Sequence, residues 1–257
     1  MGGTVILLTI ILGSILYLPF SQNMKYLLYL LGSFGFIGGM DDALKLFRKK
    51  NEGLTSLQKF IIQIVIAVIF SILLVQSDFA VLGLSHPIAL GVLATFVVVA
   101  SANAANLTDG LDGLAGGLLG IAFLCFAYLI LGHHPELGNW LFLWSGAILG
   151  FLWFNLFPAR WFMGDVGSLA LGAGLGGVAL LTNNILPLIL IAFPFIAETV
   201  SVIIQVGYFK ITRKRIFRMS PLHHHFELGG MTEVQVVQRF WAVGLFCALV
   251  AIAIMSR

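Results

Sequence analysis

The sequence predicts an all-α, polytopic membrane protein, a helical bundle with about nine transmembrane helices. Of its 257 residues, 60% are hydrophobic and only 10% are charged, and the mean hydropathy is +1.03. Soluble domains carry about a quarter charged residues, so a soluble protein of this size would lack the polar residues to cover its surface. Long stretches also contain no Asp, Glu, Lys or Arg, namely 60–77, 79–108, 113–135 and 166–197.

The apolar runs divide into nine spans, since a helix needs about 20 mostly apolar residues to cross a bilayer. Runs such as IIQIVIAVIFSILL do not alternate between apolar and polar residues, which argues against the strands of a membrane barrel. A helix also satisfies its backbone hydrogen bonds within one segment. We expect a single transmembrane domain, 1–257, with spans near 5–20, 26–40, 60–77, 86–105, 113–132, 138–156, 166–182, 185–208 and 238–256.

Basic residues indicate the orientation of the chain, because cytoplasmic loops are enriched in Lys and Arg. With the N-terminus placed inside, all 14 Lys and Arg residues except Lys25 and Arg257 fall on the cytoplasmic side. The same side carries five aspartates at or near helix ends, namely Asp41, Asp42, Asp109, Asp112 and Asp165. Ionisable residues are costly at membrane depth and tend to be functional. This grouping favours a divalent metal and a phosphorylated substrate.

Two adjacent carboxylates, Asp41 and Asp42, close the second span in the sequence GGMDDALK. Mg²⁺ prefers oxygen ligands, but neighbouring residues of a helix point about 100° apart. One aspartate is therefore expected to bind metal directly, and the other could act as a base or hold a water. Lys45 lies one turn beyond Asp41, where it could pair with an aspartate or with a phosphate.

Two further segments place polar residues on the same side. NLTDGLDGLA (106–115) contains two Asp-Gly pairs, which favour turns. It lacks the spacing and the Glu of an EF-hand loop, so we interpret it as a nucleotide or metal shelf. In NLFPARWFMGDVGS (155–168), Asp165 lies near a helix N-terminus, where backbone N–H groups favour phosphate. Phe162 could stack on a base or, like Trp161, anchor the membrane interface.

The long loop before the last span contains three histidines in SPLHHHFE (220–227). Consecutive residues rarely converge on one ion, so we favour pyrophosphate contact by one or two histidines, with the third structural.

Two features lie inside predicted spans. GAGLGG (172–177) matches a dinucleotide-binding pattern, but no strand precedes it, and small residues in lipid let helices pack closely. We expect it to be a packing surface. Glu198 follows Pro194 inside a span, and its role, structural or ligand-binding, stays open.

Together these motifs resemble the polyprenyl-phosphate N-acetylhexosamine-1-phosphate transferase superfamily, with DDxxK (41–45), NLTDGLDGLA and FMGDVGS (162–168) in family order. SPLHHHFE is more specific, since relatives that use other sugars carry a different histidine motif. It makes the chain similar to the phospho-N-acetylmuramoyl-pentapeptide transferase (MraY) family. The opening MGG looks like the end of that family's PTMGG motif, and the family usually has ten spans. We therefore expect the chain to lack the family's first helix.

The resemblance implies a reaction at the cytoplasmic face of a bacterial cytoplasmic (inner) membrane. Undecaprenyl phosphate attacks the β-phosphate of UDP-N-acetylmuramoyl-pentapeptide, which gives lipid I and UMP for peptidoglycan synthesis. A covalent aspartyl intermediate stays open, and we favour direct attack. The implied partners are these two substrates and membrane lipid, with no nucleic acid, and the dimers of the family suggest a homodimer.

The resemblance also implies residue roles. Asp41, Asp42 and Asp165 are the implied catalytic residues. Asp165 would bind Mg²⁺, the expected cofactor, and Asp41 or Asp42 would deprotonate or position the lipid phosphate. Phe162 would stack on uracil, and the histidines would approach the pyrophosphate. The implied substrate-binding residues are Lys45, Asn106, Asp109, Asp112, Asn155, Phe162, His223, His224 and His225.

Two other functions compete with this one. A sister transferase that uses UDP-N-acetylglucosamine would share most motifs, but HHHFE argues against it. A secondary transporter also carries acids in membrane helices, often with inverted repeats and midplane sites. Here no repeat is found and the acids gather at one face.

Overall fold

The computed structural model describes residues 2–17, 19–48, 53–76, 81 and 86–255. The regular structure of these residues is helical, which confirms the predicted fold class. In chain order the elements are α1 (Gly2–Ser14), the 3₁₀ turn η1 (Ile15–Tyr17), α2 (Gln22–Arg48), α3 (Ser56–Gln76), α4 (Pro87–Thr108), α5 (Leu114–Ile130), α6 (Pro135–Asn155), α7 (Gly164–Leu181), α8 (Ile185–Ile191), α9 (Phe193–Thr212), α10 (Leu222–Glu227) and α11 (Glu233–Met255).

Seven helices in the described part of the chain are long and apolar enough to cross a membrane, namely α2, α3, α4, α6, α7, α9 and α11. Two shorter apolar helices, α1 with its 3₁₀ turn and α5, coincide with the other predicted spans. The span predicted over 185–208 is divided, because α8 ends at Ile191 and α9 begins at Phe193. Pro194 lies in the first turn of α9, where its missing N–H is tolerated.

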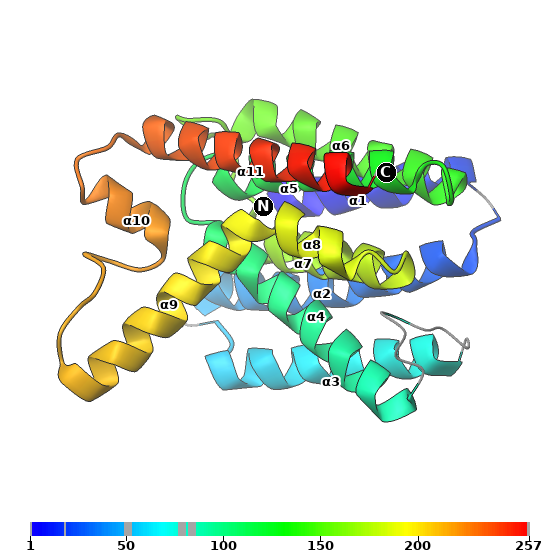
Figure 1. Ribbon diagram of the computed structural model, residues 1–257, viewed down its shortest axis with the longest axis horizontal. Helices are drawn as coiled ribbons and strands as arrows, with labels where there is room; N and C mark the ends of the chain where they lie inside the picture. The colour runs from blue at the N-terminus through cyan, green and yellow to red at the C-terminus, as the bar shows by residue number, and fades with distance from the viewer. Residues whose placement is uncertain (1, 18, 49–52, 77–80, 82–85, 256–257) are drawn as a thin grey trace.

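Helix α7 lies at the centre of the bundle, and each of its residues from Val166 to Leu181 is buried (Figure 1). A β-carbon on Gly172 would come within 2.6 Å of the Ser101 carbonyl oxygen on α4. One on Gly177 would come within 2.5 Å of Leu30 on α2. The GAGLGG segment is therefore a packing surface between α2 and α4, as its place in an apolar span predicts.

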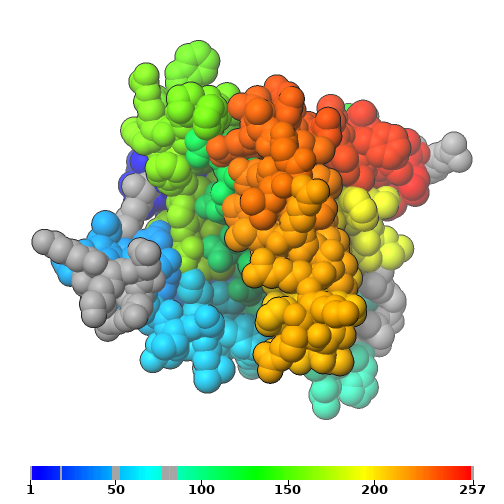
Figure 2. Space-filling model, turned by 90° about the vertical axis from the view of Figure 1, so that its left-hand side faces the viewer, coloured from blue at the N-terminus to red at the C-terminus, as the bar shows by residue number. Residues whose placement is uncertain are grey.

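The loops that carry the predicted site residues gather at one end of the bundle, on the left of Figure 1. They are the end of α2, the α4–α5 turn, the α6–α7 loop and the segment around α10. Figure 2 looks onto this end, and green atoms of the central segments are visible between the cyan start of α3 and the orange chain around α10. The C-terminal half of α9 projects away from the other helices (Figure 1). The motifs therefore share one face, as the aspartate pattern predicts.

Candidate active site

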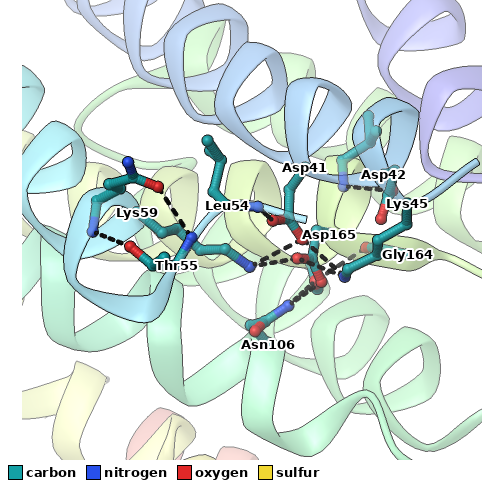
Figure 3. Close-up of polar contacts among 12 residues, drawn as sticks. Asp41, Asp42, Lys45, Leu54, Thr55, Lys59, Asn106, Gly164 and Asp165 are labelled. Carbon is teal, nitrogen blue, oxygen red and sulfur yellow. Dashed lines mark hydrogen bonds and ion pairs between the residues drawn. The ribbon is translucent and has the colours of Figure 1, made fainter. Parts of the chain in front are cut away.

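Three carboxylates from two helices converge at this end of the bundle (Figure 3). Asp41 and Asp42 lie on the last turns of α2, Asp165 lies on the first turn of α7, and one oxygen of each lies within 4.8 Å of the others. We call these residues the acidic triad. A β-carbon on Gly38 would overlap the Asp165 backbone, so glycine at this position allows α2 to approach α7 closely. Gly164 begins α7 with a φ of 69°, a left-handed conformation that favours glycine.

Two ammonium groups neutralise much of the triad. Lys45 Nζ lies 2.6 Å from Asp41 Oδ2 and 3.5 Å from Asp165 Oδ2. Lys59 Nζ, from the first turn of α3, lies 3.2 Å from Asp41 Oδ2 and 2.5 Å from Asp165 Oδ2. The backbone N–H of Leu54 also donates to Asp41 Oδ1 at 2.7 Å, which ties the start of the α3 segment to α2. The sequence places Lys59 only among the basic residues of the cytoplasmic side and gives no sign of this contact.

Asn106 joins the triad rather than the α4–α5 turn. Its amide nitrogen donates to Asp165 Oδ1 at 2.8 Å and to the Ser168 hydroxyl at 2.9 Å. These bonds orient the Asp165 carboxylate from the last turn of α4. The structure therefore places Asn106 beside the acidic triad, and its contact with substrate stays a prediction.

Asp109 lies in the turn after α4, beside the triad. Burial and the nearby charge of Asp165 raise the pKa of Asp109 to about 7, and a hydrogen bond from the Gly164 backbone offsets this only in part. A carboxyl group with such a pKa can hold or release a proton near neutral pH.

Asp112 and Asn155 hold two loops together. Asp112 Oδ2 accepts from the backbone N–H of Ala159 at 2.8 Å. Asn155, which is buried, accepts from the Gly113 N–H at 3.1 Å and donates to the Trp161 carbonyl at 2.9 Å. Their polar atoms thus bond the backbones of the α4–α5 turn and the α6–α7 loop, and their contact with a nucleotide stays a prediction.

Three further side chains lie at or contact these two loops. Glu233, on the first turn of α11, accepts from the Asp112 N–H at 2.7 Å. Sequence reasoning missed Glu233, and an acidic residue in the first turn of a helix gives no sign of a partner 121 residues away. Phe162 is 65% exposed, so its side chain is accessible for stacking. Trp161 instead stacks on Phe154 with ring centroids 4.5 Å apart.

The three histidines point to different partners. His223 is 1% exposed and lies 3.2 Å from Glu198. His224 Nδ1 is 2.7 Å from Glu227 Oε2, and His225 Nδ1 accepts from the Arg218 N–H at 3.1 Å. Their ring nitrogens therefore do not converge on one point.

Two cavities meet beside the triad. A polar cavity of about 540 Å³ is lined by Asp41, Lys45, Lys59 and Asn106, among others. An apolar groove of about 760 Å³ runs between α3 and α4 and shares Phe60 and Asn103 with the polar cavity. A third, largely apolar cavity of about 490 Å³ lies between α4, α8 and α9.

The triad has the donor set of a divalent-metal site. Mg²⁺ binds oxygen at about 2.0–2.1 Å, so two ligands of one ion lie at most about 4.2 Å apart. The triad oxygens lie within 4.8 Å of one another, so small side-chain movements would let them share one ion. Carboxylates, rather than His or Cys, also match the preference of Mg²⁺ for oxygen.

The chain is similar to known proteins along nearly its whole length. The family model described as "Glycosyl transferase family 4" matches residues 23–183. The phospho-N-acetylmuramoyl-pentapeptide-transferase of Staphylococcus carnosus is 45% identical, over 98% of this chain and 83% of that protein. The enzymes of the same name from Geobacillus thermodenitrificans and Bacillus subtilis are 46% and 45% identical, each over 99% of this chain and 82% of theirs.

Proposed function

The chain belongs to the phospho-N-acetylmuramoyl-pentapeptide transferase family, and from this membership we propose the reaction that it catalyses. It transfers phospho-N-acetylmuramoyl-pentapeptide from its UDP conjugate to undecaprenyl phosphate, and the products are lipid I and UMP. It is a multi-pass membrane enzyme of peptidoglycan synthesis. We place its active site on the cytoplasmic face of a bacterial cytoplasmic membrane, since the basic residues gather at the end that holds the triad.

Asp165 is the proposed ligand of Mg²⁺, with Asp42 and Asp41 next to it. The support is the mutual distance of the three carboxylates and the orientation of Asp165 by Asn106. When bound, Mg²⁺ would neutralise charge on the pyrophosphate and on the departing UMP.

The acceptor phosphate is proposed to bind in the polar cavity, where Lys45 and Lys59 supply two ammonium groups. Lysine binds phosphate as a point charge, and Asp41 lies between the two lysines. We therefore favour Asp41 over Asp42 as the carboxylate that positions the lipid phosphate, since it holds both lysines. The prenyl chain would follow the apolar α3–α4 groove, which opens from the same cavity.

The donor is proposed to lie over the α4–α5 turn and the α6–α7 loop. Phe162 offers an exposed ring on which uracil can stack. Asp112 and Asn155 fix the backbone of the two loops beneath it. His224 and His225 are half-buried and lie on the helix next to this turn, where they can approach the pyrophosphate.

The observation that carries the proposal is the junction of a charged phosphate site with an apolar groove. Phosphoryl transfer needs positioning and charge neutralisation more than covalent chemistry. Lysines and carboxylates supply both, and the groove brings a lipid phosphate to the same point. Direct attack of this phosphate on the donor needs no covalent aspartyl intermediate.

The test is transfer to undecaprenyl phosphate in detergent with Mg²⁺, with UDP-N-acetylmuramoyl-pentapeptide and UDP-N-acetylglucosamine offered separately. Lipid product and UMP from the muramoyl donor alone are expected. Product from the other donor alone would refute the donor assignment and keep the transferase class. Ion-coupled uptake into vesicles without lipid product would instead favour a transporter.

A further inference from the structure

Glu198 and His223 form a buried ionisable pair where α9 meets α10. Glu198 is 0% exposed and His223 is 1% exposed. Glu198 Oε1 accepts from the backbone N–H of His223 at 3.2 Å and lies 3.2 Å from the ring nitrogen Nδ1. Glu198 Oε2 and both ring nitrogens make no hydrogen bond of good geometry with any residue that the structure describes. Buried polar groups with incomplete partners cost stability, so an apolar pair would join the two helices better. The pair therefore calls for a role other than stabilising the fold.

The His223 ring connects this pair to the donor side of the site. A β-carbon on Gly110 would overlap the ring at Nε2, so the ring lies directly against the backbone of the Asp109–Gly110 turn. Asp109 in turn accepts a hydrogen bond from the Gly164 backbone, next to Asp165. Contacts thus run from Glu198 through His223 to the turn beside the acidic triad.

The same carboxylate fixes α10. The N–H that it accepts lies in the first turn of this helix, where backbone donors have no partner within the helix. The His224 ring follows directly, with its centroid 4.2 Å from that of His223. A movement of His223 would therefore also move His224.

We propose that Glu198 is a positioning residue for the sugar-nucleotide donor, which acts through His223 to fix α10 against the Asp109–Gly110 turn. This inference rests on the proposed function, because the donor is the ligand expected between these two elements. A carboxylate beside one imidazole nitrogen sets the orientation of the ring and the nitrogen that carries its proton. Glu198 does not line the polar cavity around Lys45 and Lys59, so binding of the acceptor is expected to be independent of it.

The test measures KM for UDP-N-acetylmuramoyl-pentapeptide and for undecaprenyl phosphate separately, with the full chain in detergent. Glu198→Ala is expected to raise the donor KM about tenfold, within the range found for residues that orient a ligand-binding side chain, and to leave the acceptor KM within about twofold. Glu198→Gln keeps an oxygen for the His223 N–H and is expected to recover part of the loss. Ser201→Ala is the matched control, since its buried hydroxyl donates to the α9 backbone at the Glu198 carbonyl rather than to the Glu198 carboxylate. An equal rise in both KM values would overturn the proposal.

A double-mutant cycle separates action through His223 from a general loss of packing. Residues in one network are not additive, so Glu198→Ala is expected to add less than about twofold to the donor KM of His223→Ala. Effects that multiply would overturn the proposal. If Glu198→Ala does not fold, the same double-mutant cycle on the donor KM is made with Glu198→Gln and His223→Gln. Wild-type protein that does not use the muramoyl donor would refute the proposed function and this inference together. An active wild type with an unchanged Glu198→Ala variant would refute this inference alone.

Discussion

Replacement of Lys59 by Met is expected to reduce transfer while it increases the affinity for Mg²⁺. The Lys59 ammonium lies 2.5 Å from Asp165 Oδ2 and 3.2 Å from Asp41 Oδ2, and its side chain is only 17% exposed. In the described part of the chain, Lys45 supplies the other ammonium at the triad, 2.6 Å from Asp41 and 3.5 Å from Asp165. The variant therefore keeps three carboxylates and loses one of these two cations.

The size of each effect follows from the charges. At an effective dielectric near 20, two unit charges about 3 Å apart interact by about 5 kcal/mol before desolvation is counted. Removing one pre-organised group that stabilises charge in the transition state typically costs about 3–4 kcal/mol, so we expect kcat/KM for undecaprenyl phosphate to fall about 10²–10³-fold. The metal effect has the opposite sign, because Mg²⁺ no longer meets the charge of Lys59. We expect half-saturation at about three- to tenfold less Mg²⁺.

The assay is the initial rate of lipid product formation in detergent, with Mg²⁺ and undecaprenyl phosphate varied in turn. Lys59→Arg keeps the charge and is expected to retain more activity than Lys59→Met. Lys25→Met removes an exposed lysine from the opposite end of α2 and is expected to change neither quantity. The reasoning fails if Lys59→Met keeps kcat/KM within about twofold of wild type, or if it needs more Mg²⁺ instead of less.

Three further predictions test other parts of the site. Phe162→Ala is expected to raise the donor KM about tenfold, since base stacking is worth about 1–3 kcal/mol. Phe157→Ala is the control, because Phe157 is also exposed, and it is expected to change the donor KM little. Gly38→Ala places a methyl group against the Asp165 backbone and is expected to lose about 1–3 kcal/mol of stability, seen as a lower Tm. Gly32→Ala, on the same helix with no atom within 4 Å of the added carbon, should not lower the Tm. Because the pKa of Asp109 is raised from 3.8 to about 7, folding takes up a proton there between these two values, so stability falls as pH rises across this range and levels off above about pH 7. In Mg²⁺-free detergent, the Tm of Asp109→Asn minus that of wild type should increase from about pH 5 to about pH 8. A difference that does not change with pH would contradict the raised pKa.

The helices were predictable because lipid requires long apolar runs, and the predicted spans coincide with helices of the structure, except that the span over 185–208 is divided between α8 and α9. Their ends were less predictable. The span predicted to end at residue 40 continues as α2 to Arg48, since Asp41 and Lys45, one turn apart, pair at 2.6 Å on the helix. The charged residues that follow the apolar run mark the end of the membrane span, but the helix itself continues beyond them to Arg48.

The site was predictable where residue type alone limits the chemistry. Paired aspartates at helix ends indicated the triad, and consecutive histidines were not expected to share an ion. Lys59 and Glu233 could not be assigned, because Lys59 bonds Asp165 106 residues away and Glu233 bonds Asp112 121 residues away. Asn155 has a residue type that suits a nucleotide, yet its polar atoms bond two loops, and only the tertiary structure gives those partners.

The position of the triad suits two substrates that differ in solubility. One is a water-soluble nucleotide and the other carries a long apolar chain, so their phosphates can meet only where water and lipid meet. The polar cavity and the α3–α4 groove share Phe60 and Asn103, so a phosphate near Lys59 can have its chain in lipid. A triad in the middle of α7 would be reached by neither substrate, because that helix is buried from Val166 to Leu181. Placing Asp165 on the first turn of α7, just before this buried stretch, holds the reacting groups at the boundary.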